Sequence, residues 1–330
     1  MTATQLTTSA PPPTAQEAVP EWFRVSGRGD RIYSIVVTAA AVAIPGLLAL
    51  LAFSILLAAW PALRQFGFSF VTSSDWNPVA RQFGAAPAIY GTLVSSAIAL
   101  LIATPLALGS AIWLSEVAPA WLKTPVAFLV DLLAAIPSVV YGLWGIFVLL
   151  PILRTAVMPF LRDTLGLGAF PLFQGPMYGQ SMLAAGLILA VMVLPYIAAV
   201  SREVLMAVPR SQREAALALG ATRWEVVRDA VVPYAKSGII GGIILGLGRA
   251  LGETMAVTML IGNRHEISAS LLAPGYTMAS LIANEFAEAT DDTHLAALMA
   301  VGFLLFVVTI VVNVIARWLV ARTARAGAGI

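Results

Sequence analysis

The chain has 330 residues, of which 59% are hydrophobic and only 11% are charged, whereas soluble proteins carry about 25% charged residues. This composition excludes an ordinary soluble domain, and a net charge of only +2 argues against a nucleic-acid-binding protein. The absence of cysteine excludes disulfides and thiolate chemistry, and two histidines are too few for a histidine-rich metal site. The sequence therefore predicts an integral membrane protein.

The N-terminal residues 1–31 are predicted to form a disordered cytoplasmic tail, because they are polar and rich in proline. The apolar run that follows, residues 32–60, is longer than the core of a cleavable signal peptide, which has about 7–15 residues. We therefore expect this run to be the first transmembrane helix.

Six stretches are long enough to span a bilayer, which takes about 20 apolar residues in a helix. Lipid leaves helices or closed barrels as the only spanning structures, and uninterrupted apolar runs of this length predict helices. Placing both termini in the cytoplasm puts most of the 19 lysine and arginine residues inside, as the positive-inside rule requires. The predicted fold class is thus an all-α polytopic membrane protein, with spans at about 32–59, 88–113, 126–153, 182–201, 237–261 and 296–318.

Polar residues and prolines interrupt the third and fourth spans. Asp131 lies near the cytoplasmic end of the third span, where packing or gating at the helix end is favoured over contact with a substrate. Pro137 and Ser138 in the third span and Pro195 in the fourth predict kinks, at which serine hydroxyls can satisfy freed backbone groups. Such kinks are candidate hinges.

The cytoplasmic loop 202–236 contains two helix-start patterns. The segments "SQRE", which starts at Ser211, and "TRWE", which starts at Thr222, each place a hydroxyl residue three positions before glutamate, as in a capping box. Gly220 lies between them at a position typical of a helix C-terminus. Two short helices are therefore expected, either as an amphipathic linker on the membrane surface or as a surface that another protein covers.

The spacing in this loop resembles the EAA loop of binding-protein-dependent ABC importer permeases. The segment "EAALALG" is followed by "ATRWEVVRDAVVP", in which the final proline matches the family pattern while alanine and valine replace its isoleucine and leucine. The resemblance implies a coupling helix that docks on an ATPase subunit. The positions that it carries over to this chain are Glu214, Ala215, Ala216, Gly220 and Pro233.

The fifth span contains two charged residues, Arg249 and Glu253, in the segment "GLGRALGETM". A charge at the bilayer centre costs roughly 2.5–3.5 kcal/mol on insertion scales. At 100° per residue, both residues fall near Gly242 and Gly246 on one stripe of the predicted helix. Small residues allow close helix packing, so the stripe is expected to face protein or a pathway instead of lipid.

Two interpretations of this pair remain open on the residues alone. In the first, Arg249 and Glu253 neutralise each other and fasten the helix to its neighbours. In the second, Arg249 offers a planar set of donors to an oxyanion, while Glu253 orients the guanidinium and prevents the anion from being trapped. Thr254 is a weaker candidate for the same pathway.

Further polar residues precede and interrupt the sixth span. An acidic run is interpreted as a solvated loop in preference to a contact for an external partner, and consists of Glu285, Glu288, Asp291 and Asp292. Asn313 is expected to form an interhelical hydrogen bond.

No Walker A motif is present, because neither of the two lysines, Lys123 and Lys236, follows a glycine. The chain is therefore expected to hold no cofactor, to have no ATPase site and not to be an enzyme. If ATP drives its function, ATP and Mg²⁺ are bound by another polypeptide.

Three further stretches resemble the PstC family of phosphate-specific ABC importer permeases. They are "AAIPSVVYGLWG" (134–145), "LPYIAAVSREVLMAVP" (194–209) and "GGIILGLGRALGETMAVTMLIGN" (241–263). The resemblance implies a type I ABC importer transmembrane domain over 86–320 in the cytoplasmic membrane of a bacterium. It also implies phosphate as the substrate, and a pathway role for Arg249 and Glu253. The implied partners are a PstA-type permease, a PstB-type ATPase dimer and an extracytoplasmic phosphate-binding protein.

Two alternatives differ in substrate or in energy source. A permease for sulfate, molybdate or phosphonate would share every architectural feature. A stand-alone secondary transporter is expected to show an internal repeat with interrupted helices; we find no convincing repeat, and that class leaves the EAA loop unexplained.

Overall fold

The computed structural model describes residues 27–327, so most of the predicted N-terminal tail lies outside the described residues. The chain divides into two compact units, Met1–Phe53 and Ser54–Ile330. Within the first unit, residues 27–53 belong to the long apolar helix α1 (Gly27–Phe66). The end of α1 and all later elements belong to the second unit.

Among residues 27–327, six helices are long and apolar enough to cross a membrane, as the sequence predicted. The bounds of the third and fifth depart most from the prediction: the third begins at Ser138 instead of at residue 126, and the fifth covers Arg223–Gly252 instead of 237–261. The six segments are Gly29–Phe66, Ala86–Val117, Ser138–Thr164, Met182–Met206, Arg223–Gly252 and Asp292–Val320.

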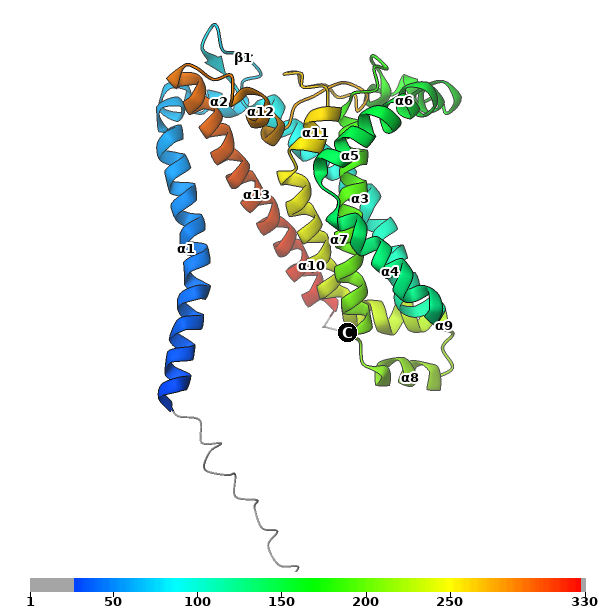
Figure 1. The fold of residues 1–330 in the computed structure, drawn as a ribbon. Helices are drawn as coiled ribbons and strands as arrows, with labels where there is room; N and C mark the ends of the chain where they lie inside the picture. The colour runs from blue at the N-terminus through cyan, green and yellow to red at the C-terminus, as the bar shows by residue number, and fades with distance from the viewer. Residues whose placement is uncertain (1–26, 328–330) are drawn as a thin grey trace, which may run out of the picture. The chain divides into compact units, whose positions relative to one another are not determined.

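The predicted third span is divided at proline. Helix α4 (Ala120–Ala135) ends before Ile136, whose extended backbone leads into Pro137 and α5 (Ser138–Trp144). The residue before proline disfavours helical geometry, and proline has no N–H to donate. Figure 1 shows α4 and α5 following each other alongside α7 (Met182–Met206). From α5 the helix continues without interruption to Thr164, through η3 (Gly145–Leu149), α6 (Leu150–Ile152), η4 (Leu153–Val157) and η5 (Phe160–Thr164). Two short turns follow, η6 (Leu167–Ala169) and η7 (Pro171–Phe173).

Two tyrosines satisfy the carbonyls that this break exposes. The Tyr141 hydroxyl donates to Leu133 O at 2.8 Å, and the Tyr196 hydroxyl donates to Ala134 O at 2.9 Å. We expected serine hydroxyls in this role, but no such bond from Ser138 is found among the described residues. The fourth span differs, because Pro195 lies buried inside α7 and the helix continues through it.

The fifth span is also divided, and this corrects the expected helical stripe. Helix α10 (Val232–Gly252) ends before Glu253, which is extended, and a short helix α11 (Met255–Leu260) begins after Thr254. The Thr258 hydroxyl donates to Thr254 O at 2.8 Å, which satisfies one carbonyl near the break. Arg249 and Glu253 therefore do not lie one turn apart on a continuous helix.

Small residues make the contacts at the centre of the second unit. Helix α3 (Ala86–Ile112) presents Ala99, Ala103 and Ala107 to the apolar side chains of α7. On α10, a side chain in place of Gly246 would come within 2.7 Å of Ile197 of α7. In lipid the hydrophobic effect does not drive helices together, so close packing at small residues stabilises their association instead. Helices α3, α7 and α10 lie side by side in this way (Figure 1).

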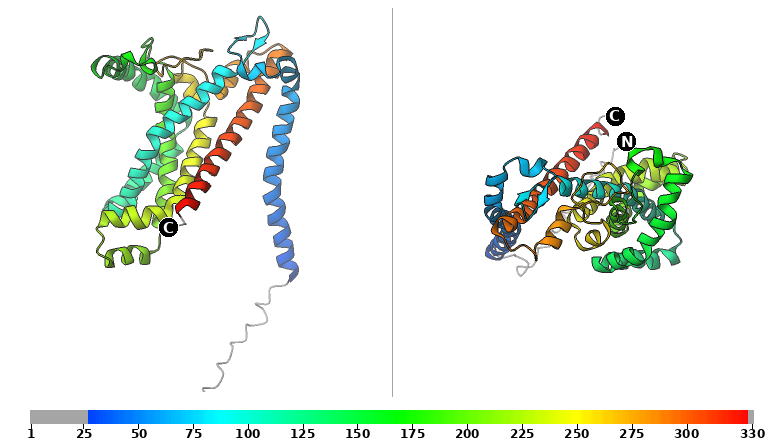
Figure 2. Two further views of the ribbon diagram at one scale, coloured as in Figure 1. Left: turned by 180° about the vertical axis from the view of Figure 1, so that it is seen from behind. Right: turned by 90° about the horizontal axis from the view of Figure 1, so that it is seen from above.

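The segments that the sequence predicted to be outer loops form a second core at one end of the second unit (Figures 1 and 2). Buried residues of the end of α1, the short helices and the first turns of α13 meet there, including Phe70, Phe83, Met278 and Leu298. The elements involved are α2 (Ser69–Thr72), the antiparallel strands β1 (Trp76–Asn77) and β2 (Gln82–Phe83), α12 (Met278–Glu285) and α13 (Asp292–Gly327).

The long loop at the opposite end forms only the first of the two short helices that we expected. The second is wrong as a separate element, because α9 (Arg223–Glu225) continues through η8 (Val226–Val231) into α10 as one helix. Thr222 and Glu225 form the predicted capping box of α9. Helix α8 (Arg210–Ala218) begins one residue before Ser211 and has Pro209 as its N-cap, so the first predicted capping box is wrong. Gly220 has a φ of +86°, which glycine adopts readily as a residue that ends a helix.

Candidate functional site

Arg249 lies near the C-terminal end of α10 and faces α7. Its guanidinium carbon is 4.4 Å from the centre of the Tyr196 ring, over the ring face. Its Nε atom is buried without a hydrogen-bond partner. Within residues 27–327 no ion pair joins Arg249 to Glu253, so the mutual neutralisation considered from the sequence does not occur here.

A cavity of about 640 Å³ lies beside Arg249. Helices α7, α10 and α13 contribute to its wall, and the described residues that line it include no aspartate or glutamate. The lining residues are Tyr196, Gly241, Ile244, Leu245, Gly248, Arg249, Asn313 and Arg317. Two arginines on one cavity without a lining carboxylate give it a positive field, because low-dielectric walls screen charge poorly.

For two of the lining residues, Asn313 and Arg317, the sequence did not predict a place at this cavity. Asn313 donates to Thr309 O of its own helix at 2.8 Å, so the expected interhelical bond is wrong. Arg317 is an exposed residue of α13 that the sequence suggested only as part of the positive charge at the cytoplasmic side. The cavity gives both residues a place next to Arg249.

Glu253 and Thr254 lie in the break between α10 and α11. The Thr254 hydroxyl makes a long contact of 3.4 Å with Gly252 O. Neither residue lines the cavity. The geometry thus separates Arg249 from the two residues that the sequence grouped with it.

Asp131 is one half of an ion pair near the other end of α7. Its Oδ2 lies 3.6 Å from Arg202 Nη2, which joins α4 to α7. This fits the expected packing role at a helix end. Ser138 starts α5, and Pro137 precedes it, so both lie at the observed break.

Arg213 fastens the α8 loop to the body of the bundle. Its guanidinium donates to both carboxylate oxygens of Glu116, at 2.8 and 3.3 Å, and also to Leu205 O and Val208 O. Glu116 lies on η2 (Trp113–Val117), which continues α3. The sequence did not reveal this pair, because the two residues are 97 positions apart.

Most of the loop residues that the sequence analysis selected are exposed to solvent and take no part in this attachment. Glu214, Ala215 and Gly220 are exposed, while Ala216 is half-buried against the core below. Two large apolar side chains, Leu219 and Trp224, are 90% and 65% exposed. Pro233 lies inside the continuous helical run Arg223–Gly252, directly after the π-helical turns at Val226–Val231, so its missing N–H removes one backbone hydrogen bond from that run.

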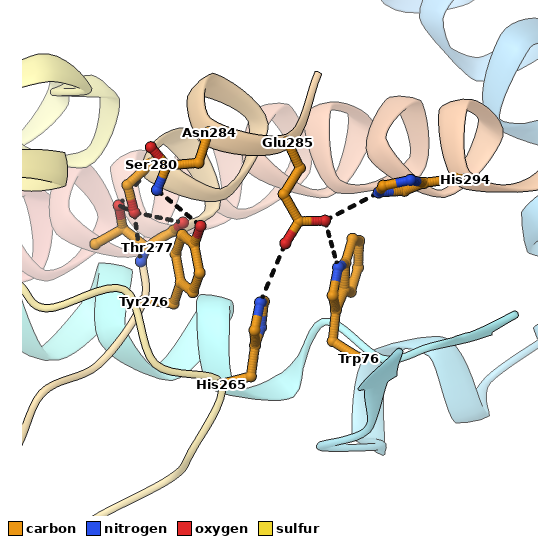
Figure 3. A network of polar contacts seen from close by, with 8 residues as sticks. All are labelled: Trp76, His265, Tyr276, Thr277, Ser280, Asn284, Glu285 and His294. Atoms are coloured by element: carbon orange, nitrogen blue, oxygen red, sulfur yellow. Dashed lines mark hydrogen bonds and ion pairs between the residues drawn. The ribbon is translucent and has the colours of Figure 1, made fainter. Parts of the chain in front are cut away.

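A half-buried carboxylate organises the opposite end of the molecule, as Figure 3 shows. Glu285 accepts hydrogen bonds from Trp76 Nε1 at 2.7 Å, His294 Nε2 at 2.9 Å and His265 Nε2 at 3.3 Å. The Glu285 side chain is only 17% exposed, so its interpretation as part of a solvated run is wrong. We refer to Glu285, Trp76, His265 and His294 as the outer clasp.

Burial alone would raise the pKa of Glu285, but the hydrogen bonds of the outer clasp and the charge of His265 lower it below its ordinary value of 4.5. The other acidic residues of the run behave differently. Asp291 pairs with Arg81 at 3.0 Å, and Glu288 is exposed.

The first two turns of α3 hold the loop beside the outer clasp. The Tyr90 hydroxyl donates to Ser268 O at 2.8 Å, and the Met278 N–H donates to the Thr92 hydroxyl at 2.9 Å. The same helix therefore contacts the outer loops at one end and, through Glu116, the α8 loop at the other.

Comparison with known proteins gives matches over most of the chain. Residues 103–325 match the family model of the binding-protein-dependent transport system inner membrane component. A phosphate transport system permease protein PstC from Mesorhizobium japonicum is 49% identical over 91% of this chain and 92% of its own length. The protein of the same name from Haemophilus influenzae is 45% identical over 84% of this chain and 88% of its own length.

A solved structure shares the fold at low sequence identity. One chain of a bacterial alginate ABC transporter, in complex with an alginate-bound periplasmic protein, aligns with a TM-score of 0.57 and 18% identity. The alignment covers 89% of this chain and 98% of that one.

Proposed function

The chain belongs to the family of binding-protein-dependent transport system inner membrane components and, within it, to the PstC permeases, and from this premise we propose how it moves its substrate. It is a multi-pass membrane protein with the type I ABC importer transmembrane fold, and it is a non-catalytic permease subunit. We propose that it supplies half of the translocation pathway for inorganic phosphate, and that Arg249 contacts the anion there.

The observation that carries this proposal is the Arg249 cavity. A guanidinium offers paired donors that match the oxygens of phosphate, and no carboxylate of the described residues occupies those donors. Translocation needs contacts that are weak enough to release the ion. The half-buried Arg249 beside an aromatic ring, with the exposed Arg317 further along the same cavity, satisfies this requirement better than a closed ring of cations.

The partners follow from the architecture of such importers. We propose a PstA-type permease for the other half of the pathway, a PstB-type ATPase pair that binds ATP and Mg²⁺, and an extracytoplasmic phosphate-binding protein. In this arrangement both termini of the chain are cytoplasmic. The exposed surface of the α8 loop, with Glu214 and Gly220, then faces the ATPase, and this chain needs no cofactor of its own.

The test is transport by the reconstituted complex. The chain is placed in proteoliposomes together with the proposed PstA-type permease, PstB-type ATPase and phosphate-binding protein, and uptake of radiolabelled phosphate is followed with and without ATP. We expect ATP-dependent phosphate uptake that excess sulfate, molybdate and phosphonate do not inhibit. Uptake of one of those anions in preference to phosphate would identify another oxyanion permease, and uptake driven by an ion gradient without ATP would identify a secondary transporter.

The attachment of the α8 loop gives a second expected result. Arg213→Gln leaves Glu116 without a cation and two carbonyls with fewer donors, and breaking such a half-buried pair costs about 3–5 kcal/mol. We expect phosphate-stimulated ATP hydrolysis by the complex to fall at least about tenfold. A loss of only about 1.4 kcal/mol in the free energy that holds the α8 loop in its attached position lowers the equilibrium constant for attachment tenfold.

The matched control for this variant is Arg210→Gln. Arg210 lies on the same helix, is exposed, and forms no ion pair among the described residues. Equal losses in the two variants would mean that the charge of the loop matters and that its attachment to Glu116 does not.

A further inference from the structure

Tyr196 contacts two parts of the molecule that are distant in sequence. Its ring lies under the guanidinium of Arg249, with 4.4 Å from Cζ to the ring centre. Its hydroxyl donates to Ala134 O at 2.9 Å, at the end of α4. We propose that Tyr196 is a positioning residue that holds Arg249 while the pathway is vacant and connects it to the α4–α5 break. This proposal deepens the proposed function and rests on it.

The first step concerns the vacant state of Arg249. A half-buried guanidinium needs a partner, and Glu253 does not provide one in this structure. The electron-rich face of tyrosine attracts a cation without carrying a charge. An arriving oxyanion offers a stronger, charge-assisted partner, so the ring and the anion compete for one guanidinium. A carboxylate at this place would compete far more strongly and would neutralise the site.

The second step concerns the carbonyl of Ala134. In a continuous helix it would accept from the N–H of Ser138, but α4 ends at Ala135 and α5 starts at Ser138. The Tyr196 hydroxyl satisfies this carbonyl instead. Because a buried carbonyl without a donor is costly, the phenol stabilises the present arrangement of α4 and α5.

The two contacts belong to one rigid side chain and are therefore linked. A ring whose face is covered by Arg249 has one favoured orientation, and in that orientation its hydroxyl reaches Ala134 O. When an anion draws the guanidinium away, the ring loses one of the two contacts that fix it. Occupation of the cavity then weakens the bond at the break, and α4 becomes free to reorient relative to α5.

Two substitutions separate these contacts. Tyr196→Phe keeps the ring under Arg249 and removes the bond to Ala134 O, whereas Tyr196→Leu removes both. If phosphate must displace a cation–π contact in order to bind, removing that contact should raise the affinity for phosphate about 3- to 30-fold. We expect Tyr196→Leu to bind phosphate about tenfold more tightly than wild type. Tyr196→Phe should bind it more tightly than wild type but less tightly than Tyr196→Leu, because the ring still covers Arg249 and has lost only the linked bond to Ala134 O.

The binding measurement is a ³¹P NMR titration of the nucleotide-free importer complex in nanodiscs with inorganic phosphate. Tighter binding of phosphate by Tyr196→Leu would show that the ring competes with the anion for Arg249. If Tyr196 only packed the helices, its replacement by leucine would weaken phosphate binding. Unchanged or weaker binding by Tyr196→Leu would overturn the first step.

The break is tested without any anion. The chain has no cysteine, so spin labels can be placed at Phe128→Cys on α4 and Leu143→Cys on α5, which are both exposed. We expect the distance distribution between these labels to broaden in Tyr196→Phe. The matched control is Tyr234→Phe, since Tyr234 is exposed and its hydroxyl makes no hydrogen bond among the described residues. An unchanged distribution in Tyr196→Phe would overturn the second step.

These outcomes are separable from failure of the proposed function. If the wild-type complex transports another oxyanion, the titration with phosphate shows no binding to any variant, while the label distances still test the break. If the wild type transports phosphate and both Tyr196 variants behave as wild type, only the role of Tyr196 is lost.

Discussion

Arg249→Gln is expected to reduce phosphate uptake by the reconstituted complex at least about 100-fold, which corresponds to about 2.7 kcal/mol. Glutamine is of similar length and polar, but it lacks the charge and the paired donors that bind phosphate oxygens. Hydrogen bonds to charged groups contribute about 1.5–3 kcal/mol each, so losing two of them accounts for an effect of this size.

Two further variants make this result interpretable. Arg249→Lys keeps the charge and is expected to retain a small part of the uptake, because ammonium cannot replace the planar fork. Arg322→Gln is the matched control, since Arg322 lies on α13 against Trp318 and does not line the cavity. Failure of the Arg249→Gln complex to assemble would indicate that Arg249 fastens helices, and normal uptake would remove it from the pathway.

Glu285→Gln is expected to destabilise the outer loops by about 3 kcal/mol. The carboxylate accepts from three donors of the outer clasp, and removing the charge of a half-buried, hydrogen-bonded group carries a cost of this order. In glutamine an amide NH₂ group replaces one of the accepting oxygens, so one donor of the clasp would face another donor. Hydrogen exchange should therefore accelerate in residues 262–294, with little change in α7.

The control for the outer clasp is Glu288→Gln, which removes the same charge from an exposed neighbour. Similar exchange in both variants would mean that the acidity of the run matters and that the clasp does not. The retention of transport at low temperature in Glu285→Gln would show that the clasp stabilises the outer loops without taking part in the pathway.

The pH dependence of this region follows from the lowered pKa of Glu285. Burial opposes ionisation, but the hydrogen bonds of the clasp outweigh it, so the folded pKa lies below 4.5. The ionised carboxylate therefore stabilises the loops at pH above 4.5, and this contribution is lost as the pH falls through the folded pKa. The difference in exchange between wild type and Glu285→Gln should shrink in that range.

The sequence was sufficient for features that depend on local pattern. Long apolar runs predicted six spans, and the capping box at Thr222 formed as expected because its two residues lie within one turn. The box at Ser211 failed, since Pro209 had already started the helix. The proline at 137 predicted a disruption, and the structure has a complete break there.

Contacts between distant segments could not be predicted in this way. The sequence singled out Arg249, whose pathway role stays a prediction, but its partner Tyr196 was not predicted, because only packing of α10 on α7 brings them together. Helical periodicity placed Glu253 beside Arg249, and this failed where the helix ended at Gly252. The sequence did not single out the histidines, because the carboxylate that they share lies at the end of α12, 20 residues from His265 and 9 from His294.

Helix α3 is attached at both ends, to the outer loops through Tyr90 and Thr92 and to the α8 loop through Glu116. At 1.5 Å per residue it forms a rod of about 40 Å between these attachments, with Pro105 as its only internal proline. Forces applied to the α8 loop are thus transmitted along α3 to the outer surface. Linkage makes such coupling reciprocal, so the free energy by which a change at the α8 loop affects the outer loops equals that by which a change at the outer loops affects the α8 loop.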